Sequence, residues 1–346
     1  MITQSKNKLN EEGIVSIVVT LIIMIILTLI VTGFAQLARR EQREALDRQL
    51  SAQASYAAES GINALKAALP YITADSRTTC DDITIVPTYG ANPFTSTTLN
   101  DSSSYTCLLF NRKPKELYLQ DVADDPVIAP LTLEDSSGPV ALGNLNISWK
   151  AKDGSTGVNS SAPGEFPTAS LWGKSIGILR LDLIPIPEFP VPITPAGLDA
   201  ATKSFLLQPQ NAGVETKRIG EINSGDVIGV RCNASPNSGC TFTITDLILK
   251  KYYLRMRSIY NTSSVTLNNQ LPGGVTSTGR FIGAQIEIDS TGRAADVLKR
   301  IKVRIEDPDS PVSSTKSSNF PEYAFSSNEK LCKRLSLPST AQDLCD

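Results

Sequence analysis

Histidine is missing from this sequence of 346 residues. Because histidine is the commonest general acid or base and the commonest metal ligand, its absence lowers the expectation of an enzyme or a metalloprotein. Glycine-rich phosphate loops, nucleophile elbows and metal-ligand spacings are missing as well. A hydrolase that used carboxylates alone would need an acid with a raised pKa in a cleft, and no residue pattern indicates one. We therefore predict no enzyme activity, no catalytic residue and no cofactor.

Two groups of acidic residues are candidates for Ca²⁺ binding. They are Asp121, Asp124 and Asp125 in the first group and Glu306, Asp307 and Asp309 in the second. Neither group follows the spacing of an EF-hand loop, and adjacent prolines indicate turns. We interpret both as solvated loops and predict no metal site.

An excess of charge is missing too, since 33 basic residues face 35 acidic ones for a formal net charge of −2. No basic field is available to attract nucleic acid, so we expect no nucleic-acid partner. Charged residues make up only 20% of the chain, and serine, threonine, asparagine, proline and glycine are abundant. This composition is typical of a β-rich, loop-rich protein outside the cytoplasm.

Cys-x-x-Cys pairs are absent although the chain contains six cysteines, so a structural zinc site is not expected. The even number favours disulfides and an oxidising compartment, with six unlinked thiols in a cytosolic protein as the alternative. Pairing of sequence neighbours closes the shortest loops. It predicts the disulfides Cys80–Cys107, Cys232–Cys240 and Cys332–Cys345.

A long hydrophobic run is present near the N-terminus. Residues 14–34 carry no charge, and a helix of this length, at ~1.5 Å per residue, spans a bilayer core of ~30 Å. The run is longer than the core of a typical signal peptide, and no small-residue cleavage site follows it. We predict a single transmembrane helix over residues 14–34.

The charges around this run point to two different orientations. Two lysines precede it and four arginines follow it, namely Lys6, Lys8, Arg39, Arg40, Arg43 and Arg48. Counting lysine and arginine alone would place the C-terminal part in the cytoplasm, whereas the cysteines favour the opposite side. We follow the cysteines, because the arginines alternate with acidic residues, and predict an extracytoplasmic head.

Residues 35–69 predict a stalk that continues the same helix. Strong helix formers dominate, Gly61 is the only glycine, and Pro70 marks the stop. The helix would run from about residue 14 to 69, on the order of 80 Å. A stripe of small and apolar residues recurs every three or four positions: Leu46, Leu50, Ala54, Ala57, Gly61, Ala64 and Ala68. We expect its C-terminal half to pack on the head and its N-terminal half to contact partner helices or lie near the membrane.

The head divides by composition into residues 70–196, a variable part rich in Ser, Thr and Pro, and the β-rich residues 197–346. Few strand signals precede Asn144. Alternating patterns predict strands at residues 145–149, 175–184, 251–260, 282–288 and 301–305, with a turn at 289–296. The prolines of residues 185–195 predict a stiff connector; a ligand for a proline-reading domain is the alternative. The expected fold is α+β: a long N-terminal transmembrane and stalk helix packed on an antiparallel sheet formed by the C-terminal strands.

Several short sequences at the N-terminus resemble a known family. They are Gly13 with the apolar run from Ile14, Leu27-Thr28-Leu29, Asp47-Arg48-Gln49 and Ala57-Ala58-Glu59-Ser60-Gly61. Over about residues 11 to 66, the chain resembles type IV pilin-like proteins, and most closely the PilX-type minor pilins. The resemblance implies that a prepilin peptidase removes a leader of residues 1–13 by cutting between Gly13 and Ile14. It also implies that the helix anchors the subunit in the membrane and then bundles with the helices of other pilin subunits.

One position departs from the pattern of major pilins. Those carry Glu at the fifth mature position, where its charge can meet a neighbour's N-terminal amine, and here that position is Val18. Burying an amine without a partner is costly, so a repeating main subunit is disfavoured. The resemblance implies a minor pilin that acts in assembly, tip capping or adhesion to a surface or host ligand. A single-pass, membrane-anchored surface binding protein outside any filament is the alternative. The loop from Cys332 to Cys345 is either a staple for the tail or an exposed contact surface.

Overall fold

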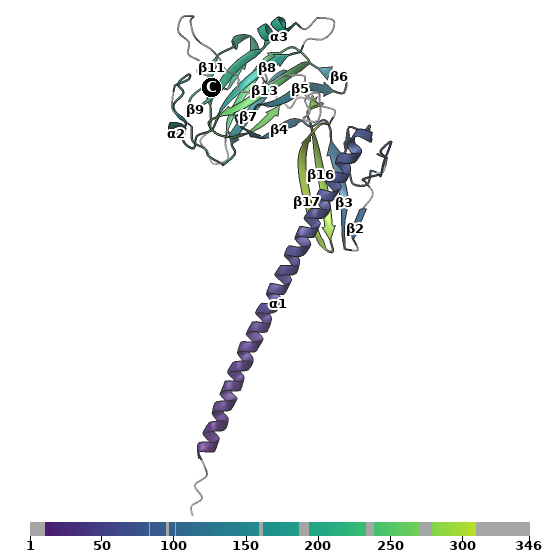
Figure 1. Ribbon diagram of the computed structural model, residues 1–346, viewed down its shortest axis with the longest axis vertical. Coiled ribbons are helices and arrows are strands. Elements are labelled where there is room, and N and C mark those ends of the chain that lie inside the picture. The colour runs from purple at the N-terminus through teal and green to yellow at the C-terminus, as the bar shows by residue number, and fades with distance from the viewer. Residues whose placement is uncertain are drawn as a thin grey trace, which may run out of the picture. The chain divides into compact units, whose positions relative to one another are not determined.

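The computed structural model describes residues 11–82, 84–94, 97–100, 102–158, 162–186, 194–232, 239–269 and 279–308. The chain divides into two compact units (Figure 1). The first unit comprises the residues up to Leu109 together with Ile288–Val303, and the second comprises Phe110–Glu287 and the residues from Arg304 onward. In sequence, most of the second unit is therefore inserted between two segments of the first. The predicted boundary at residue 196 falls in α3 (Pro195–Ala201), inside the second unit.

The first unit is built on helix α1 (Glu11–Ala68), which has 58 residues. A 3-10 turn, η1 (Leu69–Tyr71), follows it. Pro70 lies in this turn, where its missing N–H ends the α-helical hydrogen-bond pattern. The single long helix predicted from the sequence is thus present with nearly the predicted bounds.

The sheet of the first unit has the strand order β1-β3-β16-β17, and β2 pairs with β3. Its strands are β1 (Ser76–Arg77), β2 (Thr97–Asn100), β3 (Ser103–Asn111), β16 (Gln285–Ala294) and β17 (Val297–Glu306). The sheet lies beside the C-terminal part of α1 (Figure 1). This arrangement gives the α+β, pilin-like fold expected from the sequence.

Helix and sheet meet through small residues. The buried residues of the helix face are Ala54, Ala57, Ala58, Gly61, Ile62, Leu65 and Ala68. A Cβ atom at Gly61 would lie 2.6 Å from Ser290 Oγ. A Cβ atom at Gly292 of β16 would overlap the backbone of Ala54 and Ala58. Glycine at both positions therefore permits the close approach of helix and strand.

The predicted helix stripe needs one correction. Ala64 is only half-buried, and the neighbouring Leu65 is fully buried in its place, because the sheet covers a wider arc of the helix than one line of residues. Leu46 is 57% exposed, in the half of the stalk that was not expected to pack on the head.

The second unit contains two sheets. A five-stranded sheet has the order β10-β12-β7-β14-β4, and a seven-stranded sheet has the order β11-β9-β8-β13-β5-β15 with β6 on β5. Their strands are β4 (Glu116–Val122), β5 (Val127–Asp135), β6 (Gly138–Val140), β7 (Gly143–Ala151), β8 (Ile178–Pro185), β9 (Lys203–Gln210), β10 (Thr216–Arg218), β11 (Val227–Arg231), β12 (Cys240–Leu247), β13 (Lys251–Ile259), β14 (Ser263–Asn268) and β15 (Arg280–Phe281). The short helices are α2 (Ala169–Trp172), α3 and the 3-10 turn η2 (Ile219–Glu221).

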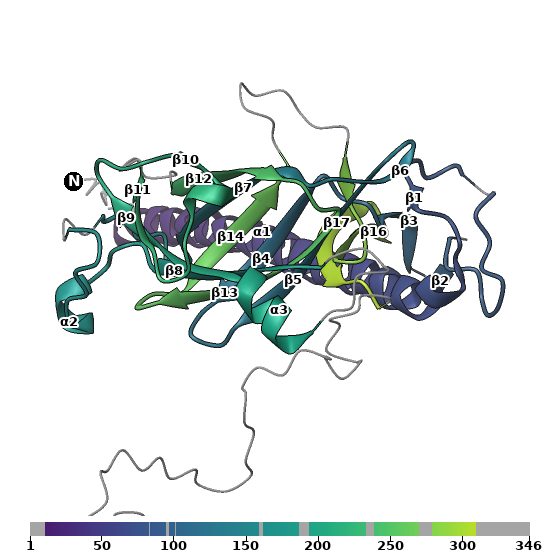
Figure 2. The same cartoon turned by 90° about the horizontal axis from the view of Figure 1, so that it is seen from above.

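One hydrophobic core joins these two sheets. It includes Trp149 and Phe242 from the five-stranded sheet and Leu181, Phe205 and Leu254 from the seven-stranded sheet. Figure 2 shows the strands of both sheets from above. The second unit thus buries its apolar side chains between its own sheets.

The predicted strands at 145–149, 175–184, 251–260 and 301–305 correspond to β7, β8, β13 and β17. However, β13 belongs to the second unit and not to the sheet on the helix. The chain does reverse within the predicted turn segment 289–296, but only at Ala295 and Asp296, because β16 continues to Ala294. The small residues that suggested a turn, including Ser290 and Gly292, are instead required beside α1.

The paucity of strand signals before Asn144 was also misleading, since β2 to β6 lie there. Pro130 is in the middle of β5, where a proline argues against a central strand. Among the described residues, Pro130 has a strand neighbour only in Tyr253, because β15 and β6 pair with the end of β5. The proline connector lies mostly outside the described residues, as does the pair Cys332–Cys345.

Candidate functional site

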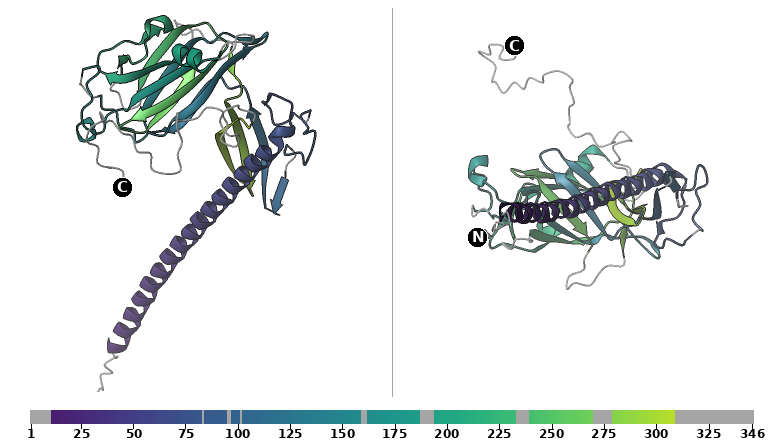
Figure 3. Two further views of the ribbon diagram at one scale, coloured as in Figure 1. Left: turned by 45° about the horizontal axis from the view of Figure 1, so that its top comes forward. Right: turned by 90° about the horizontal axis from the view of Figure 1, so that it is seen from below.

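The N-terminal part of α1 is the candidate functional site, because every side chain from Ser16 to Gln49 is exposed. The exposed fraction of its large apolar side chains ranges from 48% at Ile30 to 71% at Met24. The left panel of Figure 3 shows this part of the helix extending away from the sheet of the first unit. A continuous apolar surface of this kind is not expected to face water. Its partners must be lipid tails or apolar side chains of other chains.

The polar groups within the apolar run are compatible with a lipid environment. The hydroxyl of Thr20 donates a hydrogen bond to the carbonyl oxygen of Ile17 (2.9 Å), and that of Thr28 donates to Met24 (2.6 Å). The hydroxyl of Thr32 donates to the carbonyl oxygen of Thr28 (2.9 Å). These groups are satisfied within the helix, as a membrane-spanning segment requires. Among the described residues, this helix alone is long and apolar enough to cross a membrane.

A charged segment follows the apolar run. Arg40 Nε lies 3.2 Å from Glu44 Oε1, and Arg48 Nη2 lies 4.0 Å from Glu44 Oε2. Exposed pairs of this kind contribute roughly 0.3–0.5 kcal/mol each. They support the helix between the apolar run and the head, where its described residues are exposed up to Gln49.

Gly13 and Ile14, between which we predict peptidase cleavage, lie in the first turn of α1. Val18, at the predicted fifth mature position, is 51% exposed, so any apolar environment of the helix also surrounds this side chain. The structure therefore places the predicted cleavage site and the missing acidic position on one continuous helix.

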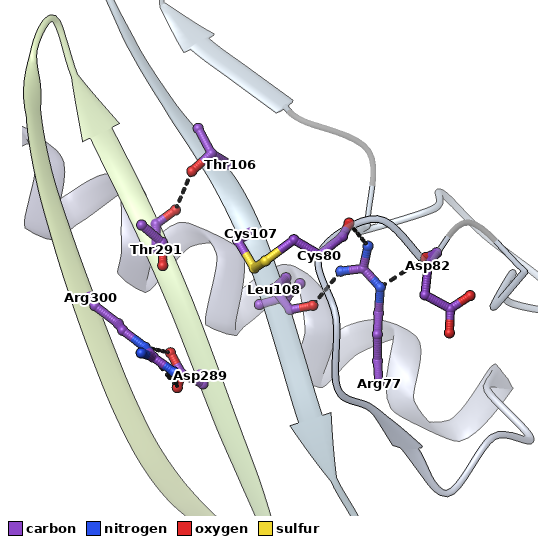
Figure 4. Close-up of a disulfide and its surroundings, with 9 residues drawn as sticks. All are labelled: Arg77, Cys80, Asp82, Thr106, Cys107, Leu108, Asp289, Thr291 and Arg300. Atoms are coloured by element: carbon purple, nitrogen blue, oxygen red, sulfur yellow. Dashed lines mark hydrogen bonds and ion pairs between the residues drawn. A yellow bond between two sulfur atoms is a disulfide. The ribbon is translucent and has the colours of Figure 1, made fainter.

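The chain leaving η1 is held on β3 by a buried arginine (Figure 4). Arg77 is 2% exposed. Its guanidinium donates hydrogen bonds to the backbone carbonyl oxygens of Asp82 (3.0 Å), Cys80 and Leu108. Burial lowers the pKa of Arg77, whereas nearby Asp82 acts to raise it. No local pattern predicts a role for Arg77, because it lies in a polar segment without periodicity.

Among the described residues two disulfides are present, and both are pairs predicted from sequence proximity. Cys80–Cys107 ties the segment after the helix to β3, with a Cα–Cα distance of 5.2 Å (Figure 4). Cys232–Cys240 connects the end of β11 to β12 in the second unit, with a Cα–Cα distance of 4.2 Å. Each of these two cross-links lies within one unit, and both fit an oxidising compartment.

Of the acidic residues considered for Ca²⁺, Asp121 forms an ion pair with Lys152 at 2.5 Å, and Asp309 lies outside the described residues. Within the described part of the chain, no three His, Cys, Asp or Glu residues gather as metal ligands would.

A long, exposed apolar helix whose C-terminal part packs on a small sheet is consistent with an α+β, pilin-like fold. Residues 12–63 match the family model described as PilX N-terminal. The N-terminal region of the chain is therefore a PilX-type region, as the resemblance predicted. This match fits a membrane-anchored, pilus-associated protein. Neither the curated proteins nor the solved structures gave a match.

Proposed function

We propose that this chain is a minor subunit of a type IV pilus or a related filament. The observation that carries the proposal is the exposed apolar half of α1 within a region that matches PilX N-terminal. In a membrane, lipid tails cover this surface. In a filament, the apolar helices of other pilin subunits replace the lipid, so the same face serves both states.

The proposed maturation step is removal of residues 1–13. A prepilin peptidase cuts between Gly13 and Ile14 and leaves Ile14 as the new N-terminus. No acidic residue lies between Ile14 and Arg40, so a buried N-terminal amine would find no carboxylate on a neighbouring copy. This supports a role for the subunit at the filament tip or in the initiation of assembly, and it disfavours a role as the repeating main subunit.

The proposed role of the second unit is contact with a surface or host ligand. It has its own core and its own disulfide, so it can present loops without the support of the helix. The two disulfides support an extracytoplasmic head. Assembly, tip capping and adhesion are compatible with one another in a subunit of this kind.

The test is the intact mass and N-terminal sequence of the chain from membranes that contain a prepilin peptidase. The expected N-terminus is Ile14, and Gly13→Leu should retain residues 1–13 while leaving the fold of the head unchanged. The mature chain should also appear in sheared filament fractions, in far lower amount than the main subunit. An uncut wild-type chain that is absent from filaments would favour the alternative, a single-pass surface binding protein.

A further inference from the structure

Arg39 and Arg43 lie on one face of α1, directly after the apolar run. They are four positions apart, and Leu50, Ala54 and Ala57 continue the same line toward the head. Leu50 is half-buried and the two alanines are fully buried against the sheet of the first unit. The two arginines therefore occupy the stretch of this helix face between the apolar run and the sheet.

These two arginines differ from the other two in the same segment. Arg40 and Arg48 both pair with Glu44. Arg39 and Arg43 are exposed and form no ion pair among the residues that the structure describes. Two guanidinium groups on one helix face are thus available for an external anion.

The distance of Arg39 and Arg43 from the end of the apolar run indicates which anion they can reach. Arg39 and Arg43 follow Phe34 by five and nine residues, or about 8 and 14 Å along the axis. The headgroup layer extends roughly 5–7 Å beyond the hydrocarbon core. Side chains on a helix lean toward its N-terminus, here toward the membrane, and long arginine side chains reach back to the interface. Both guanidinium groups can therefore reach lipid phosphates, which they are suited to bind in a bidentate way.

We propose that Arg39 and Arg43 form a binding site for the headgroups of anionic phospholipids in the leaflet on the side of the head. The site would fix the depth and rotation of α1 in the membrane, with its sheet-bearing face turned toward bound lipid. It rests on the membrane anchoring that is part of the proposed function, but neither on cleavage after Gly13 nor on entry into a filament.

The experiment reconstitutes the full-length chain in vesicles of phosphatidylcholine and phosphatidylglycerol. Spin-labelled lipids report how strongly each headgroup is retained at the protein surface. The test variant is R39Q/R43Q, and the matched control is R40Q/R48Q, which removes the same charge from the same helix. Each arginine near an anionic surface is worth about fivefold in binding. The preference for phosphatidylglycerol should therefore fall at least about fivefold in the test variant and much less in the control.

Salt should reduce the wild-type preference as well, since the Debye length falls to about 3 Å at 1 M. Equal retention of both lipids by the wild type, or an equal loss in both variants, would overturn the proposal. A loss seen only at high protein-to-lipid ratio would assign the arginines to a neighbouring copy and overturn it too. Flotation of every variant with the vesicles shows that the membrane anchor still works, so a failure of the lipid site can be told apart from a failure of the anchor.

Discussion

Replacing Gly292 with alanine should destabilise the first unit while the second unit is unaffected. The added Cβ would meet the backbone of Ala54 and Ala58, which cannot move aside as a flexible side chain can. Overpacking costs typically 1–3 kcal/mol, and a backbone contact places this substitution near the upper end, at about 3 kcal/mol. Because 1.4 kcal/mol corresponds to a factor of ten, amide protection should fall by roughly a hundredfold.

Hydrogen exchange of the full-length chain in detergent, followed by mass spectrometry, measures this effect in peptides from α1 and β3. Both tryptophans, Trp149 and Trp172, lie in the second unit, so the tryptophan fluorescence transition serves as an internal control and should not move. Gly33→Ala is the matched substitution within α1, because nothing lies within 4 Å of a Cβ there.

Gly61→Ala provides a graded comparison. Its Cβ would meet the Ser290 hydroxyl at 2.6 Å and Tyr105 Cγ at 3.0 Å, and the closer of these two, a hydroxyl at the end of a side chain, can rotate away. Alanine also gains about 1 kcal/mol over glycine in a helix. The loss should therefore be smaller than for Gly292→Ala. Unchanged protection in Gly292→Ala, or a larger effect at Gly33 than at Gly292, would refute the close packing of helix and strand.

Three further predictions concern the loops and the second unit. Arg77→Gln should destabilise the segment after η1 by about 3 kcal/mol, because backbone carbonyl oxygens lose their buried partner; limited proteolysis of residues 72–94 should become faster, and an unchanged cleavage rate would contradict this. Replacing Cys80–Cys107 by serines should cost about 3.5 kcal/mol for a sequence separation of 27, and replacing Cys232–Cys240 about 2.5 kcal/mol for a separation of 8; melting with and without reductant checks both. Burial raises the pKa of Tyr252 and Tyr253, so the unfolded chain loses these protons first and the second unit should lose stability as the pH rises above about 10. Tryptophan fluorescence during alkaline titration measures that loss, and a Tyr252→Phe variant should reduce it.

The helix could be predicted because its signals are local. An uncharged run, strong helix formers and Pro70 are visible in the sequence without any tertiary information. The disulfides Cys80–Cys107 and Cys232–Cys240 follow sequence proximity, which is also local. The PilX resemblance depends on the same segment, and the family model covers residues 12–63.

The sheet of the first unit could not be predicted from local signals in the sequence. Ser290 and Gly292 have the composition of a turn, yet they stand in a strand because α1 approaches closely there. Tyr105 and Ser290 are far apart in sequence, yet both lie beside Gly61, and no local pattern predicts such a contact. Arg77 acts through backbone carbonyl oxygens, whose positions depend on the finished fold. In each case the missing information lies in contacts between distant segments.

The insertion of the second unit has a consequence for how such a protein can diversify. The chain leaves the first unit from β3 and returns to it in β16, and these strands are neighbours in one sheet. The exit and the re-entry are thus joined by hydrogen-bonded strands, so the intervening segment can change in length and content without opening the sheet on α1. Selection can then replace the exposed module for a new environment while the helix, its glycine contacts and its membrane segment stay under separate constraint. A lineage of such subunits would keep a common N-terminal region and carry unrelated heads.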